Sequence, residues 1–267
     1  MVLHFKKLGT GCPLIILHGL YGSGDNWITI ARALSPYFTV YLIDQRNHGL
    51  SPHSPEHTYK ALTSDIEKFV EEQRLEKLCI MGHSMGGKVA MNFTLQNPLR
   101  VHKLVVIDIA MRSYTSELST SPQLAFHKKI ISALASLDIA FAETREEIDK
   151  QLARYLPQKN IRHFLLKNIR RTRNGEFFWS LNIEALRINM FLLLDKIDAG
   201  ELTFQGPVLV ISGKNSGYIR KEDHIDFRKA FPNSIIDEFD AGHWIHSEQP
   251  EILIKRMLEF LPIASGN

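Results

Sequence analysis

Short apolar runs recur along the chain, and amphipathic segments separate them. Three runs, at residues 14–17, 104–107 and 208–211, contain no polar residue. An unbroken apolar strand is what a parallel sheet covered on both faces requires. The pattern predicts six strands, at residues 13–17, 38–43, 78–81, 103–107, 207–211 and 234–239.

The segments between these runs favour helices, predicted at residues 59–73, 85–96, 221–231 and 250–261. Strands that alternate with helices predict an α/β fold with a mostly parallel sheet. From about 111 to 206 the strand signals stop, and Leu, Ile and Phe recur at three- and four-residue spacings. We therefore expect a core domain at 1–110 and 207–267 and a helical cap at 111–206, over the sheet end where such folds bind ligands. An independent second domain is the alternative, but no Gly/Ser/Pro-rich linker marks either border.

Composition narrows the class of protein. The 267 residues carry a net charge of only +3, spread evenly, which argues against nucleic acid or an anionic membrane as partner. No run approaches the roughly 18 apolar residues that span a bilayer, and the N-terminus has no apolar signal core. We therefore expect a cytoplasmic protein. As its assembly we expect a monomer or a homodimer. Cys12 and Cys79 lie in or beside strands and are expected as reduced thiols. No metal-ligand spacing occurs, and we expect neither metal nor cofactor.

The strongest local signal is the G-x-S-x-G pattern formed by Gly82-His83-Ser84-Met85-Gly86. It follows an apolar run and precedes a helical one, which is the strand–turn–helix setting of a nucleophilic serine. We predict Ser84 as nucleophile, with the N–H groups of Met85 and Leu20 as the oxyanion hole. The alternative is a glycine-rich turn with an incidental serine.

The base must follow the nucleophile and the acid in this fold. His243 stands in a loop after the last predicted strand, and His246 is its nearest rival. The loop after residue 211, the usual place of the acid, has no carboxylate before Glu222, whereas Asp108 ends the strand that follows the nucleophile helix. We predict Asp108 as acid and His243 as base, and expect solvent-exposed positions for His102, His127 and His163.

Further residues are candidates for the pocket. His18, Gly19 and Trp244 are predicted to bind substrate, Trp244 by walling the acyl site, although simple core packing of its ring is equally compatible with the sequence. Asp44 is expected to brace loops. A basic cluster in the cap can meet an anionic group such as a CoA phosphate, or form a solvated helix face; it comprises Arg162, Lys167, Arg170, Arg171 and Arg173.

Several of these segments together resemble the α/β-hydrolase esterases of the YbfF type. The resemblance rests on residues 18–27 (HGLYGSGDNW), 44–52 (DQRNHGLSP), 82–87 (GHSMGG), 106–109 (VIDI), 213–216 (GKNS) and 242–246 (GHWIH). It implies a Ser84–Asp108–His243 triad, a helical cap and hydrolysis of short-to-medium acyl esters, with acyl-CoA thioesters as a further substrate class. The chain departs from the family at Ala110-Met111, where proline is common, at Lys214 and in the cap.

The sequence therefore predicts a serine hydrolase, a carboxylesterase or acyl-thioesterase, acting on a small-molecule ester or thioester. Two alternatives remain. A carbon–carbon bond hydrolase or lyase can use the same triad, and arginines facing Ser84 would favour it. A non-catalytic binding protein of this fold would have no need of a strained serine.

Overall fold

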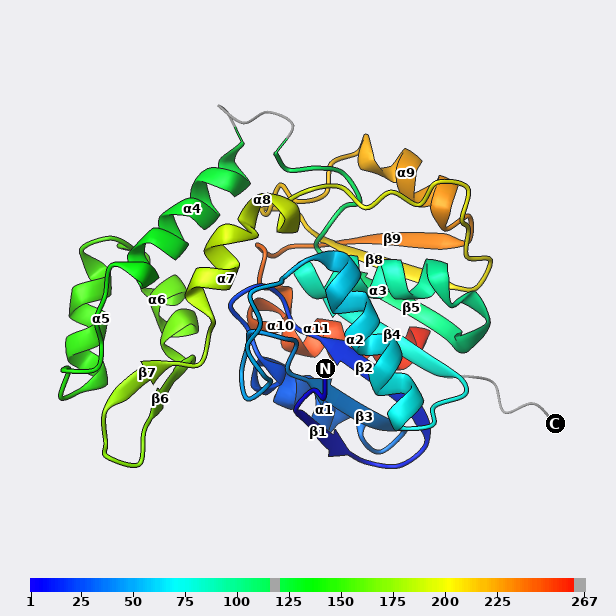
Figure 1. The fold of residues 1–267 in the computed structure, drawn as a ribbon. Coiled ribbons are helices and arrows are strands. Elements are labelled where there is room, and N and C mark those ends of the chain that lie inside the picture. Colours follow the sequence, from blue (N-terminus) through cyan, green and yellow to red (C-terminus); the bar gives the residue numbers. More distant parts are fainter. Residues whose placement is uncertain (116–120, 262–267) are drawn as a thin grey trace.

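The computed structural model describes residues 1–115 and 121–261. Its centre is a seven-stranded sheet (Figure 1). The strands are β1 (Phe5–Leu8), β2 (Cys12–Leu17), β3 (Phe38–Ile43), β4 (Leu78–His83), β5 (Val101–Ile107), β8 (Val208–Gly213) and β9 (Ser234–Phe239). All six predicted strands are present, and the predicted α/β fold with a mostly parallel sheet is confirmed.

The strand order is β1-β3-β2-β4-β5-β8-β9, and only β1 runs antiparallel to its neighbour. The carboxyl ends of the six parallel strands therefore share one edge of the sheet. The loops that follow β2, β4, β5, β8 and β9 carry the candidate residues, so the topology alone brings these distant segments to one rim.

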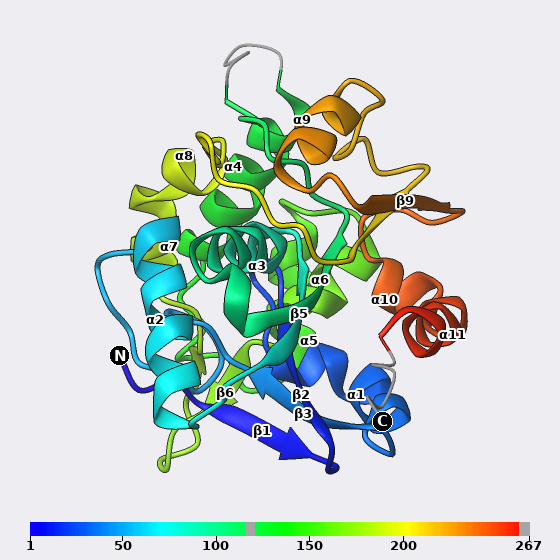
Figure 2. The same ribbon diagram turned by 90° about the vertical axis from the view of Figure 1, so that its right-hand side faces the viewer.

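Helices cover both faces of the sheet (Figure 2). On one face, α1 (Ile28–Leu34) and α11 (Pro250–Phe260) pack on the even-numbered side chains of β2, such as Leu14 and Ile16. The opposite face packs against α2 (Tyr59–Glu72), α3 (Met85–Gln96) and α9 (Asp223–Ala230). Short helices complete the core: η1 (Gly24–Trp27), η2 (Pro98–Arg100) and α10 (Ile245–Glu248).

The segment between β5 and β8 forms a separate lobe beside the sheet edge (Figure 1). Its helices are α4 (Pro122–Ala135), α5 (Arg145–Ala153), α6 (Lys159–Leu166), α7 (Ile183–Ile188) and α8 (Met190–Leu193). The cap also contains a hairpin that was not predicted, in which β6 (Ile169–Arg171) and β7 (Phe177–Trp179) pair antiparallel. Strands of three residues are too short to show a two-residue period, and their apolar residues also fit a helical spacing.

Two chain segments join the cap to the core, and they are hydrogen-bonded to each other. The N–H of Tyr114 donates to Leu194 O at 2.7 Å, and the N–H of Ile197 donates to Met111 O at 2.7 Å. Lys88, fully buried in α3, donates from Nζ to the main-chain oxygens of Arg112 (3.0 Å) and Asp195. The nucleophile helix thus contacts both segments of this stem.

Two elements of the core, the strand β1 and the helix α1, were not predicted from the sequence. In β1, Lys6 and Lys7 are exposed and the strand lies at the edge of the sheet, which explains its weak apolar signal. The seven residues of α1 are also few for a periodic pattern. Neither element contributes a candidate catalytic side chain.

Candidate active site

Ser84 lies in a sharp turn between β4 and α3. Its backbone has φ 52° and ψ −120°, a conformation that side-chain-bearing residues adopt only under strain. The turn is possible because its neighbours are glycines: a Cβ on Gly82 would lie 2.1 Å from Gly86 O, and one on Gly86 would lie 2.5 Å from Leu17 O. The strain lifts the Ser84 hydroxyl to the N-terminus of α3, where unpaired N–H groups favour a developing negative charge.

Asp108, completely buried, follows β5 with a positive φ of 49°. Its Oδ1 accepts hydrogen bonds from the Gly213 N–H (2.8 Å) and the Ser216 hydroxyl (2.7 Å). Its Oδ2 lies 2.7 Å from Nδ1 of His243. A buried carboxylate needs such partners, and three of them fix its plane toward the histidine.

His243 occupies the loop between β9 and α10. Because a carboxylate accepts, Nδ1 carries the proton shared with Asp108, which leaves Nε2 as the free acceptor of the neutral ring. The ring of Tyr218 stacks on it with centroids 3.9 Å apart and planes at 16°. The His243 main-chain oxygen accepts from Nε2 of His83 at 2.8 Å. Three contacts therefore hold the candidate base: one on the face of its ring, one at Nδ1 and one at its main-chain oxygen.

Ser84 and His243 line the same small cavity, of about 20 Å³, together with Leu20 and Trp244. Within residues 1–115 and 121–261, no hydrogen bond joins the Ser84 hydroxyl to His243. In ligand-free hydrolases this contact is often long and tightens when substrate binds. The arrangement thus places an oriented imidazole beside a strained serine.

The proposed oxyanion donors border this serine. Met85 is the first residue of α3, so its N–H has no partner within the helix. Leu20, in the loop after β2, lines both small cavities that contain Ser84. Gly19 lets this loop approach, because a Cβ there would lie 2.7 Å from Nδ1 of His83 and 3.2 Å from Cβ of Ser84. Leu20 and Met85 thus approach the serine from two different loops.

A family model described as the alpha/beta hydrolase fold matches residues 13–250, nearly the whole of the described core and cap. The chain belongs to the α/β-hydrolase family. The zebrafish (Danio rerio) sn-1-specific diacylglycerol lipase ABHD11 is 36% identical over 264 residues, covering 96% of this chain and 80% of its own. Esterase YbfF of Escherichia coli is 32% identical over 252 residues, covering 93% and 92%. A solved structure named marine microorganism esterase is 47% identical, with a TM-score of 0.94 and coverage of 97% and 99%. The resemblance to YbfF-type esterases is confirmed.

Trp244 and His18 differ in how they relate to the pocket of this α/β-hydrolase. Trp244 borders the cavity beside Ser84 and packs against the cap rings of Phe126 and Phe164. The His18 ring is buried; Nδ1 donates to Gly19 O at 2.9 Å, and Nε2 accepts from the Gln45 N–H at 3.0 Å. These contacts hold the His18 ring between its own loop and the loop after β3; a substrate contact of His18 stays a prediction.

His127 was expected in solvent, and this expectation is wrong. The residue lies on the buried face of α4, and its Nε2 is 3.0 Å from the Tyr218 hydroxyl. Burial lowers its pKa to about 3. Its spacing from Leu124 and Ile131, three residues before and four after, is that of one helical face and is the signal that could have found it.

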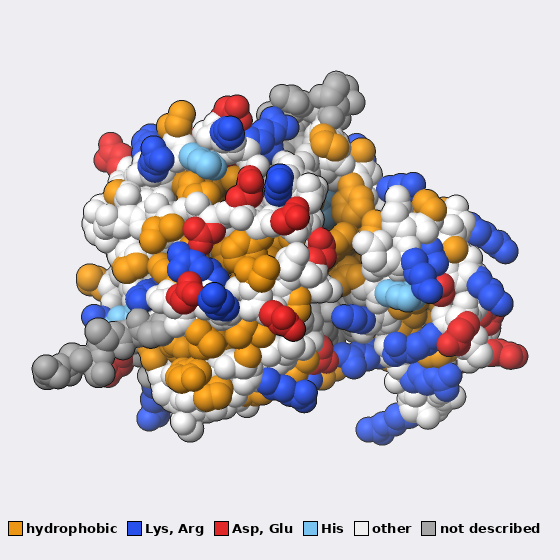
Figure 3. Space-filling view, turned by 180° about the vertical axis from the view of Figure 1, so that it is seen from behind, with side chains coloured by type: hydrophobic (Ala, Val, Ile, Leu, Met, Phe, Trp, Pro, Cys, Tyr) orange, Lys and Arg blue, Asp and Glu red, His pale blue; other side chains and the backbone are white. Residues whose placement is uncertain are grey.

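The basic cap cluster does not form a single surface. Arg162 is buried and pairs with Asp149, with Nε 2.6 Å from Oδ1. Arg170 and Arg171 belong to β6, not to a helix, and the Arg171 guanidinium lies over the Phe177 ring. Lys and Arg side chains are nonetheless scattered over the outer surface of the cap (Figure 3).

Asp44 braces loops as expected, accepting hydrogen bonds from the Gly24 and Leu50 N–H groups.

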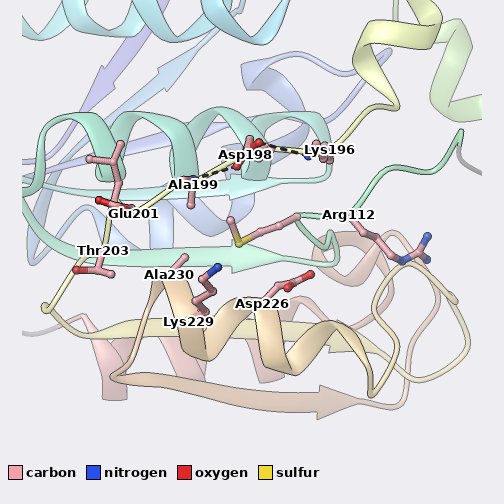
Figure 4. Close-up of a pocket in the computed structure, with 13 residues that line it drawn as sticks. Arg112, Lys196, Asp198, Ala199, Glu201, Thr203, Asp226, Lys229 and Ala230 are labelled. Atoms are coloured by element: carbon pink, nitrogen blue, oxygen red, sulfur yellow. Dashed lines mark hydrogen bonds and ion pairs between the residues drawn. The ribbon is translucent and has the colours of Figure 1, made fainter.

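Larger cavities lie around the site. One of about 670 Å³ opens beside His243 and is walled by Phe126, Tyr218 and Trp244. Another, of about 540 Å³, continues past Trp244 toward Lys167. A third, of about 280 Å³, lies at the cap stem, where Asp226 and Lys229 of α9 face the segment of Lys196 to Ala199 (Figure 4), and its lining does not include Ser84. Of these three cavities, the one of about 670 Å³ has the candidate base His243 in its lining.

Two further findings concern ligands and membranes. Within residues 1–115 and 121–261, no group of three or more His, Cys, Asp or Glu residues is placed to hold a metal ion. In the same residues, every helix is too short or too polar to cross a membrane.

Cys12 and Cys79 are free thiols.

Proposed function

We propose that this α/β-hydrolase is a serine esterase that cleaves short-to-medium acyl esters through an acyl-enzyme on Ser84. The observation that carries the proposal is the 2.7 Å contact between His243 Nδ1 and Asp108 Oδ2, beside a cavity that Ser84 and His243 share. The relatives named esterase and diacylglycerol lipase support ester substrates.

In the proposed reaction, Nε2 of His243 takes the proton of the Ser84 hydroxyl as its oxygen attacks the ester carbonyl. The N–H groups of Leu20 and Met85 stabilise the oxyanion of the tetrahedral intermediate. The imidazolium then protonates the leaving alcohol. Water, deprotonated by the same nitrogen, attacks the acyl group and releases the acid.

Asp108 stabilises the imidazolium in both halves of the reaction. Its carboxylate is buried, and the Gly213 N–H and Ser216 hydroxyl hold the oxygen that does not face His243. A carboxylate fixed in this way keeps the proton on Nδ1 and therefore leaves Nε2 unprotonated for Ser84.

The alternatives are less well supported. A carbon–carbon bond hydrolase was expected to show arginines facing Ser84, but among the described residues neither Arg nor Lys lines the two cavities that contain it. A binding protein would not require Ser84 at φ 52°. Oxygen esters are favoured over CoA thioesters because the basic cluster that would meet the CoA phosphates is divided between buried and separate positions.

Turnover of p-nitrophenyl acetate and butyrate tests the proposal, with Ser84→Ala as the matched control. We expect wild-type hydrolysis well above background and none above background in the variant. Equal rates in both proteins would contradict the proposal. Butyryl-CoA, followed by thiol release, compares the thioester directly, and we expect a lower kcat/KM for it than for the oxygen ester.

A further inference from the structure

His127 is a cap residue that lines two small cavities at Ser84, one of about 10 Å³ and one of about 20 Å³. Among the described residues, the two cavities share three lining residues: Leu20, Ser84 and His127. Two of these belong to the proposed nucleophile and oxyanion hole. The third adds an imidazole from the cap to the lining of both cavities.

One nitrogen of this imidazole is satisfied and the other is not. Nε2 lies 3.0 Å from the Tyr218 hydroxyl, whereas Nδ1 is buried and has no hydrogen-bond partner among residues 1–115 and 121–261. An imidazole nitrogen accepts better than a phenol oxygen, and a phenol donates better than an imidazole N–H. Tyr218 therefore donates to Nε2, which leaves the proton of the neutral ring on Nδ1.

The other aromatic hydroxyls around the two cavities are already engaged. Tyr59 donates to Leu193 O at 2.6 Å, Tyr114 to Tyr218 O at 2.8 Å and Tyr21 to the His127 main-chain oxygen at 3.4 Å. The last contact also fixes the backbone at His127. Nδ1 of His127 is thus a buried donor without a hydrogen bond, on a residue that lines both cavities at Ser84.

We propose that His127 is a specificity residue whose Nδ1–H donates a hydrogen bond to a second oxygen of the substrate, one close to the scissile ester group. This inference rests on the proposed esterase function. The substrate class it names is an ester that carries an ether, hydroxyl or carbonyl oxygen two or three bonds from the scissile linkage, on either the acyl or the alcohol side.

The physical reason is the free energy of a buried donor. An alkyl group placed against Nδ1–H leaves that donor desolvated and unpaired, while an oxygen at the same place satisfies it. Recognition therefore favours oxygen over a methylene group of nearly equal size. Because the imidazole is neutral, the hydrogen bond does not require an anionic acceptor. A neutral oxygen of the substrate is sufficient.

Two variants separate this role from a structural one. In His127→Asn the side-chain amide nitrogen can take the place of Nδ1 and the contact to Tyr218 is lost. In His127→Gln the amide group reaches the place of Nε2, so the contact to Tyr218 is kept and the donor at Nδ1 is lost. Packing effects lower the activity of both variants, but only the loss of the Nδ1 donor changes the preference for oxygen.

Two substrate pairs test the two sides of the ester. On the acyl side, p-nitrophenyl methoxyacetate is compared with p-nitrophenyl butyrate; on the alcohol side, 2-methoxyethyl butyrate is compared with butyl butyrate. Within each pair an oxygen replaces one methylene group. The ratio of kcat/KM values within a pair is measured for each protein, and dividing the ratios of two proteins cancels the intrinsic reactivity of the esters.

In one of the two pairs, we expect the preference of the wild type for the oxygen-containing ester to fall about three- to tenfold in His127→Gln. The ratio in His127→Asn should stay within about twofold of the wild type. The pair that responds identifies the side of the ester that His127 contacts. Unchanged ratios in His127→Gln for both pairs, with all four esters hydrolysed, would overturn this inference alone. Absence of wild-type hydrolysis of every ester would overturn the esterase proposal and this inference with it.

Discussion

The rings of Tyr218 and His243 lie face to face, with centroids 3.9 Å apart. Tyr218 and Ser216 belong to the loop of residues 214–218 after β8, and Gly213 is the last residue of that strand. The Gly213 N–H and the Ser216 hydroxyl hold Asp108, and the Tyr218 ring stacks on His243. One short segment therefore positions both the candidate acid and the candidate base. Residues 213–218 contain no carboxylate, so they act on Asp108 through these two hydrogen bonds.

Replacing Asp108 by Asn should reduce kcat by about 10⁴-fold, because the amide removes the charge that stabilises the imidazolium and permits the wrong tautomer. The steady-state rate with p-nitrophenyl butyrate measures the effect. Glu222→Gln, at a carboxylate just beyond this loop, serves as the control and should keep near wild-type activity. A larger loss in Glu222→Gln than in Asp108→Asn would contradict the assignment of the acid.

Replacing Gly19 by Ala should lower kcat by at least tenfold while the protein stays folded. The added Cβ would lie 2.7 Å from Nδ1 of His83 and 3.2 Å from Cβ of Ser84, so the loop that carries Leu20 must retreat. Loss of one oxyanion donor alone costs about 10²- to 10³-fold in kcat. Rates with p-nitrophenyl acetate, together with thermal unfolding of both proteins, measure the outcome. Unchanged kcat would mean that this loop does not supply an oxyanion donor.

The main elements of the fold could be predicted because their signals are local. Unbroken apolar runs mark strands buried on both faces, and β4, the turn and α3 stand together in the sequence around Ser84. Asp108 could be predicted for a similar reason, since no carboxylate follows β8 before Glu222 and Asp108 comes directly after β5.

Other features depend on contacts between distant segments. His127 and Tyr218, which are hydrogen-bonded, are 91 residues apart in the sequence. The N–H of Gln45 donates to Nε2 of His18, and these two residues are 27 residues apart. The β6–β7 hairpin was missed because each strand has only three residues. These features arise from tertiary packing, which a pattern along one chain does not encode directly.

Lys88 should make stability rise with pH above neutrality. Burial lowers its pKa to about 7 from an ordinary 10.5, so between these values the unfolded chain binds the proton more strongly than the folded one. From pH 7 to 9 this proton alone should add about 2 kcal/mol to the free energy of unfolding. Lys88→Met lacks this titrating group, so its free energy of unfolding, measured with urea, should rise correspondingly less from pH 7 to 9. Equal rises in the free energy of unfolding of the two proteins would contradict the buried, neutral state of Lys88.

His246 should contribute to acid sensitivity. Its ring stacks on Trp27 with centroids 4.4 Å apart, and burial lowers its pKa to about 3 from 6.5. As the pH falls from 6.5 to 4.5, the unfolded chain takes up a proton that the folded protein does not, and about 2 kcal/mol of stability is lost. His246→Phe keeps a stacked ring without a titrating group, so its free energy of unfolding should fall by that much less. The measurement is urea unfolding at the two pH values, and identical losses would refute the prediction.

We expect Ser84 to carry the acyl group during turnover. Rapid acid quenching of the reaction with p-nitrophenyl acetate, followed by peptide mass spectrometry, measures the acylated residue directly. We expect one acetyl group on the peptide that contains Ser84, assigned to that residue by fragmentation, and no acetyl group on the same peptide in Ser84→Ala. An acetyl group on a different residue that survives in Ser84→Ala with unchanged turnover would contradict this expectation.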